Sequence, residues 1–74
     1  MNSDYQPIDC GFHDELQMRA IRGGVALILY RDEAGREHQI RDVIMDVYAR
    51  AGAEYLRLRG GEEIRLDRLL RVVG

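Results

Sequence analysis

The sequence contains no lysine and no tryptophan, and it has only one cysteine and one proline among its 74 residues. A single cysteine excludes an internal disulfide and fits a reducing compartment. No run of about 18 apolar residues occurs, which excludes a membrane-spanning helix of ordinary length. The first residues show neither the basic region nor the apolar stretch of a secretion signal. We therefore expect a soluble, cytoplasmic protein with no membrane segment.

The sequence also lacks the motifs that most directly reveal nucleotide or calcium binding. There is no P-loop, no dinucleotide fingerprint and no EF-hand pattern of acidic residues. A chain of this length buries only roughly 60–65% of its surface on folding, which leaves little room for a substrate cleft and its supporting shell. We expect a single domain over residues 1–74 that is not an enzyme and needs no cofactor.

Cys10 and His13 have a separation that is common between metal ligands. A zinc site needs about four ligands, and the remaining candidate, His38, belongs to a predicted strand elsewhere. The same pair lacks a third group that would orient a nucleophilic cysteine. We expect no metal site, and we expect Cys10 to pack as a small buried hydrophobic residue.

What the sequence has in excess is negative charge near its start. Residues 1–16 hold four acidic residues and no arginine, whereas residues 17–74 hold nine acidic residues and eleven arginines. An acidic segment attached to a slightly basic body predicts a cationic partner. The alternative interpretation is that the acids only favour the start of a helix, where the helix dipole stabilises negative charge.

The sequence predicts an extended arm over residues 1–9 and a short helix over residues 10–22. Pro7 prevents an earlier start of the helix, and Asp9 is placed to act as its N-cap. Gly23 and Gly24 predict the end of the helix. The expected core-facing stripe consists of Phe12, Leu16 and Ala20, widened by Met18 and Ile21.

The remaining residues, 24–73, predict about five antiparallel strands. Residues 25–30 are apolar and β-prone, and Gly35 lies in the turn that follows them. The apolar parity changes within residues 38–50, which predicts a bulge or bend near Asp42, with a single helical turn after Asp46 as the alternative. One helix followed by strands that are too few for two flat sheets predicts a mainly β fold, a small closed or half-open barrel.

Arginines cluster late in the chain, which raises the alternative of nucleic-acid binding. Arg57 and Arg59 alternate with leucines, Arg65 follows after the next turn, and LRGGEEI (58–64) is similar to a loop of Sm-like RNA-binding proteins. The competing interpretation is a solvated face whose arginines are neutralised by nearby acids. A net acidic chain also opposes RNA binding through long-range electrostatics. The alternative function is an Sm-like RNA-binding protein with a groove lined by these three arginines.

Four segments taken together resemble the Rof family, small Rho-binding antiterminators that inhibit the transcription termination factor Rho. They are YQPIDC (5–10), HDELQ (13–17), AEYLRL (53–58) and RLDRLLRV (65–72). The resemblance implies a mainly β fold with one N-terminal helix and a small, curved, Sm-like antiparallel β-barrel of about five strands. It also implies a function, which is to bind hexameric Rho at its primary RNA-binding site and so inhibit Rho-dependent termination.

The resemblance implies that carboxylates of the helix occupy a Rho site built for phosphates. The expected Rho-binding residues are Asp9, Asp14, Glu15 and Gln17. A second contact is expected either in the loop at 50–53 or in the loop at 59–61, with Arg50 and Arg59 as candidates, and the sequence does not decide between them. We expect a monomer without direct nucleic-acid contact, in which Tyr5, Pro7 and Ile8 attach the arm to the body.

Overall fold

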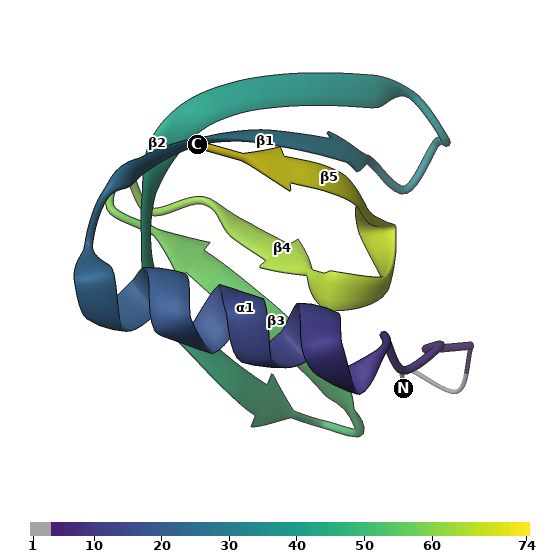
Figure 1. Cartoon of the computed structure of the whole chain (residues 1–74). Helices are drawn as coiled ribbons and strands as arrows, with labels where there is room; N and C mark the ends of the chain where they lie inside the picture. Colours follow the sequence, from purple (N-terminus) through teal and green to yellow (C-terminus); the bar gives the residue numbers. More distant parts are fainter. Residues whose placement is uncertain (1–3) are drawn as a thin grey trace.

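The computed structural model describes residues 4–74 and contains one helix and a five-stranded antiparallel sheet (Figure 1). The elements are α1 (Cys10–Arg22), β1 (Val25–Arg31), β2 (Glu37–Arg50), β3 (Ala53–Leu58), β4 (Glu63–Arg65), the 3₁₀ turn η1 (Leu66–Arg68) and β5 (Leu69–Val73). The predicted fold class, mainly β with one N-terminal helix and about five strands, is confirmed. Residues 1–3 of the predicted arm lie outside the described residues. No helix within residues 4–74 has the length and apolarity needed to cross a membrane.

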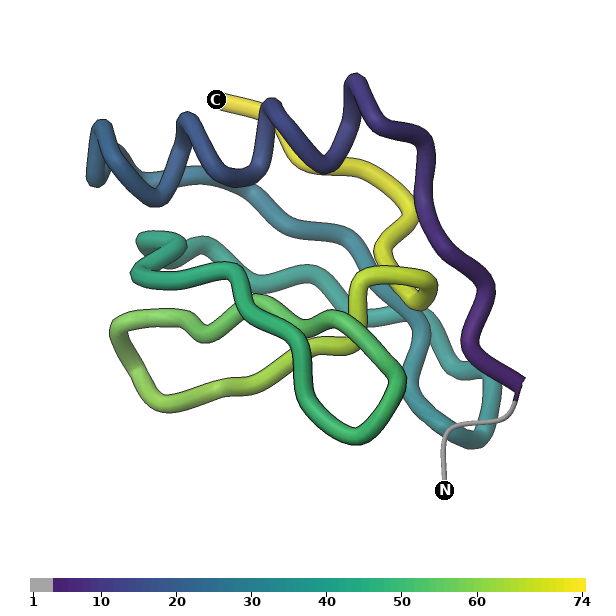
Figure 2. Tube along the Cα trace, turned by 90° about the horizontal axis from the view of Figure 1, so that it is seen from below, coloured from purple at the N-terminus to yellow at the C-terminus, as the bar shows by residue number. Residues whose placement is uncertain are grey.

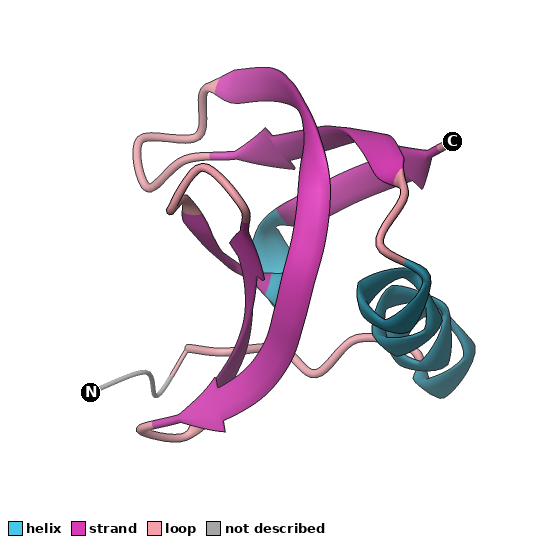
Figure 3. Cartoon of the chain, turned by 90° about the vertical axis from the view of Figure 1, so that its left-hand side faces the viewer, coloured by secondary structure: helices cyan, strands magenta, loops and turns pink. Residues whose placement is uncertain are grey.

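The strand order is β4-β3-β2-β1-β5. The central strand, β2, is long enough to belong to both halves of the sheet. Its first part pairs with β1 and its second part pairs with β3, and the strand curves strongly between them (Figure 3). The sheet thereby curls into a half-open barrel, in which β4 and β5 form the two edges of the described sheet and η1 connects them.

A bulge in β2 accompanies this curvature. The register with β3 shifts between Ile44 and Asp46, and the extra residue, Met45, is exposed while Ile44 is buried. A bulge bends the strand and increases its twist. The bend predicted near Asp42 thus lies slightly further along, at Met45. The alternative of a helical turn after Asp46 is wrong, because β2 continues as a strand to Arg50.

The core lies between α1 and the inner side of the curled sheet. Leu16 is fully buried, and Phe12 and Ala20 pack beside it as predicted. Met18 and Ile21 do not widen this stripe, since they are 46% and 78% exposed. Met18 and Ile21 follow Leu16 by two and five residues. These separations place their side chains roughly 200° and 140° around the helix from Leu16, on the side that faces away from the core. The other buried hydrophobic residues come from the strands and η1: Ala26, Ile28, Val43, Ile44, Ala53, Leu56, Leu58, Ile64 and Leu66.

Both ends of α1 are capped as the sequence predicts. The carboxylate of Asp9 accepts hydrogen bonds from the backbone N–H groups of Gly11 (3.0 Å) and Phe12 (3.3 Å). At the other end Gly23 adopts a left-handed conformation with φ 74°, which favours glycine. Cys10 is exposed and not buried as expected, because it lies about 120° from the core-facing side of the helix.

Candidate functional site

The outer face of α1 consists of five exposed residues, Asp14, Glu15, Gln17, Met18 and Ile21. Three of them were predicted to bind a partner, and the fourth predicted residue, Asp9, is exposed at the N-terminal end of the same helix. The side chain of Asp14 forms no hydrogen bond or ion pair with any residue in the described part of the chain. Its carboxylate is therefore available to a partner without loss of an internal contact.

Glu15 is exposed but engaged within the helix. Its Oε2 atom accepts a hydrogen bond from Nε of Arg19 at 3.1 Å, one turn further on. Arg19 also donates to the backbone carbonyl of Gly74 at 2.8 Å. An exposed pair of this kind contributes only about 0.3–0.5 kcal/mol. A partner's guanidinium group can therefore replace Arg19 at little cost.

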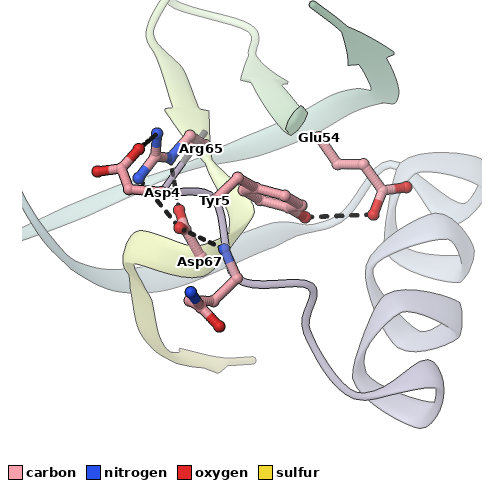
Figure 4. A network of polar contacts seen from close by, with 6 residues as sticks. Asp4, Tyr5, Glu54, Arg65 and Asp67 are labelled. Carbon is pink, nitrogen blue, oxygen red and sulfur yellow. Dashed lines mark hydrogen bonds and ion pairs between the residues drawn. The ribbon is translucent and has the colours of Figure 1, made fainter. Parts of the chain in front are cut away.

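Asp4 of the arm forms an ion pair with Arg65 of β4, although its own side chain is 78% exposed. Oδ1 of Asp4 accepts from Nη1 of Arg65 at 3.3 Å, and this hydrogen bond lowers the pKa of Asp4. The backbone N–H of Gln6 donates to Oδ2 of Asp67 at 3.1 Å, and Asp67 also accepts from Nε of Arg65 at 2.6 Å (Figure 4). Figure 2 shows the arm running from α1 past η1. These contacts attach the first residues of the arm to β4 and η1.

Glu54, at the start of β3, fastens both the arm and α1 to the sheet. Its Oε1 atom accepts from the Tyr5 hydroxyl at 3.2 Å, and its Oε2 atom lies 2.8 Å from Nε2 of His13 (Figure 4 shows the first contact). Burial, with the nearby charge of Glu54, raises the pKa of Tyr5 to about 12, so its hydroxyl stays protonated and donates at neutral pH. Ile8 packs against the core, whereas Pro7 is exposed. The expected attachment of the arm is confirmed at Tyr5 and Ile8.

Replacing Glu54 by alanine is expected to lower the free energy of unfolding by about 1–2 kcal/mol, because two part-buried partners lose their acceptor. The substitution Tyr5→Phe removes only one of the two contacts and should cost about half as much. Urea denaturation followed by circular dichroism measures both values. Unchanged stability of the Glu54→Ala variant would mean that Glu54 does not hold these elements together.

The two candidates for a second contact lie in different environments. Arg50 donates to Glu63 through two nitrogens at 3.1 and 2.8 Å, and its guanidinium carbon lies 4.7 Å from the centroid of the Tyr55 ring. Glu63 also accepts from the Tyr48 hydroxyl. The side chain of Arg59, in the turn between β3 and β4, is exposed and has no ion pair with the described residues. Arg59 is thus the more available of the two.

A cleft of about 510 Å³ opens between the β1–β2 turn, β4 and η1. Arginines and carboxylates line it in equal number: Arg31, Arg50, Arg65 and Arg68 with Asp32, Glu33, Glu62 and Glu63. The charges largely offset one another, as in the pair of Arg50 with Glu63 at 2.8 Å. The cleft therefore presents little net positive charge to a phosphate.

The arginines of the RNA-binding alternative are offset in a similar way. Nη2 of Arg57 lies 3.9 Å from a carboxylate oxygen of Asp46. The side chain of Arg65 is only 11% exposed and is bonded to Asp67. Only Arg59 in this group presents a guanidinium with no acidic partner among residues 4–74, which is less positive charge than a phosphate-binding groove normally displays.

The sequence interpretation missed Met18 and Ile21 as members of the outer face. The signal was present in the spacing, because both positions fall on the side of the helix opposite Leu16. Apolar character led to their assignment to the core, although their angular position argues against it.

Comparisons with protein-family models, with curated proteins and with solved structures find no match to this chain.

Proposed function

We propose that this protein is a cytoplasmic, monomeric inhibitor of the transcription termination factor Rho that binds Rho through α1 and blocks its primary RNA-binding site. The observation that carries the proposal is the unengaged carboxylate of Asp14 on the outer face of α1, beside exposed Glu15 and Gln17. A surface that binds phosphates displays arginine and lysine, which are also the natural partners of carboxylates. The resemblance of four sequence segments to the Rof family supports the same partner.

The way in which α1 is held suits this role. Leu16 anchors the inner side of the helix in the core, and Glu54 holds His13 to β3. A helix already fixed in the free protein loses little conformational freedom on binding, which favours affinity. Asp9 caps the helix as well as lying beside the acidic face, so its loss is expected to lower stability by about 1 kcal/mol in addition to any effect on binding.

The proposal is tested by competition between this protein and RNA for Rho. Labelled oligo-cytidine RNA bound to purified Rho should be displaced by the protein, and the same RNA should not bind the protein alone. Direct binding of the protein to Rho, measured without RNA, should weaken as salt is added, because exposed charges are screened over about 8 Å at physiological ionic strength. Replacing Glu33, an exposed acid in the β1–β2 turn, by glutamine should leave displacement unchanged.

Two other outcomes would contradict the proposal or its physical basis. Direct binding of the RNA with no effect on Rho would contradict the proposal and would favour the alternative function through Arg57, Arg59 and Arg65. Direct binding to Rho that does not depend on salt would contradict the electrostatic basis of the interaction.

A further inference from the structure

Two large apolar side chains lie exposed on the outer face of α1, Met18 and Ile21. Met18 is 46% exposed and Ile21 is 78% exposed, and neither belongs to the core of the described chain. They are neighbours on the helix surface because they are three residues apart. Isoleucine is also a weaker helix former than glutamine or lysine, so Ile21 favours neither the core nor the helix.

Charge is distributed unevenly along α1. The acidic residues, Asp14 and Glu15, lie in the first half of the outer face, whereas the exposed Arg22 lies in the last turn beside Ile21. A cationic surface is attracted to the first half and repelled by Arg22 at the end. The second half of the face therefore fits an uncharged, apolar surface of a partner.

A protein site for single-stranded RNA has both kinds of surface next to each other. Cationic groups bind the phosphates, and apolar or aromatic surfaces receive the bases. Along α1 the distance from Asp14 to Ile21 is about 10 Å, from seven residues at about 1.5 Å each. The outer face thus offers carboxylates to the phosphate subsites and apolar side chains to the base subsites.

We propose that Met18 and Ile21 insert into the base-binding surface of the site whose cations receive Asp14 and Glu15. The partner is a protein groove that is basic at one end and apolar at the other. This inference rests on the proposed function and extends it, since it makes α1 a substitute for both the phosphates and the bases of the excluded RNA.

The test uses the double variant Met18→Gln/Ile21→Gln, measured for binding to the purified Rho hexamer at several salt concentrations. Glutamine forms helices as well as methionine does and better than isoleucine, so α1 is retained. Affinity for Rho is expected to fall at least about 10-fold with an unchanged salt dependence. The variant Asp14→Asn should instead reduce the salt dependence. The matched control is Leu70→Gln, which changes a residue of β5 that is 44% exposed and should bind normally.

Three other outcomes would each overturn the inference. If the wild-type chain binds Rho and the double variant binds equally well, the apolar contact is wrong and the proposed function stands. If the wild-type chain does not bind Rho, the proposed function fails and this inference fails with it. If sedimentation shows a wild-type dimer and a monomeric double variant with unchanged affinity for Rho, the apolar residues join two copies of the chain, which also overturns the inference.

Discussion

The double substitution Asp14→Arg/Glu15→Arg is expected to abolish binding to Rho without changing the far-ultraviolet circular dichroism spectrum. Both residues are exposed, and neither contributes to the core. Two arginines would face the cations of the RNA-binding site, and like charges brought together in an interface cost several kcal/mol. The loss of affinity should therefore exceed about 100-fold in the RNA displacement assay.

A control is needed because the double variant also changes the overall charge of the protein. The substitutions Glu33→Arg/Glu37→Arg make the same change in charge in the β1–β2 turn and at the first residue of β2, away from α1, and should leave most of the affinity intact. Glu15→Arg also places a like charge beside Arg19, which weakens the helix by only a few tenths of a kcal/mol. Full affinity of the α1 double variant would remove the acidic helix as the binding element.

Replacing Leu16 by alanine is expected to lower the free energy of unfolding by about 3 kcal/mol, with a range of roughly 2.7–5 kcal/mol. Leu16 is fully buried, and it is the one residue of α1 that is completely enclosed by the core. A domain of this size has little stability in reserve, so a large fraction of molecules should be unfolded or should have a loosened helix at 37 °C.

Urea denaturation measures this effect, and the adjacent exposed residue supplies the control. Gln17→Ala also introduces an alanine, but at an exposed position on the outer face of α1. It should change the free energy of unfolding by less than about 0.5 kcal/mol. If Leu16→Ala were as stable as Gln17→Ala, the packing of α1 on the sheet could not be the main attachment of the helix.

Features determined by neighbouring residues were predictable from the sequence. The helix starts after Asp9 and ends before Gly23 as expected, because a cap and a left-handed glycine act on the adjacent backbone. The alternation of buried Leu56 and Leu58 with exposed Arg57 was predictable for the same reason. These signals depend on the periodicity of single elements and not on the way in which the elements pack.

The errors concern features that depend on geometry or on uncommon turns. The hairpin between β2 and β3 turns at Ala51 and Gly52, with φ of 52° and 82°. The sequence predicted a loop at 50–53 but not this tight turn, because alanine rarely adopts positive φ. The bulge was predicted near Asp42 but lies at Met45. The alternation of apolar residues shows that a strand changes the face it buries, but it does not show at which residue the change occurs.

The internal contacts of the acidic residues could not be predicted at all. The hydrogen bond between Asp4 and Arg65 joins residues that are 61 positions apart, and the bond between Tyr5 and Glu54 joins residues 49 positions apart. Such pairs exist only once the sheet has curled and the arm has folded back against it. The sequence therefore identified the acidic segment but not which of its carboxylates remain available.

The inner side of α1 packs on the core and the outer side is exposed. This separation affects how the sequence of the helix can evolve. The inner side, with Leu16 at its centre, is constrained by the core, whereas the five residues of the outer face contribute little to packing. Mutations on the outer face can accumulate without unfolding the chain. The helix can therefore follow a changing partner, or accept a new recognition sequence by design, while the barrel beneath it keeps the same residues.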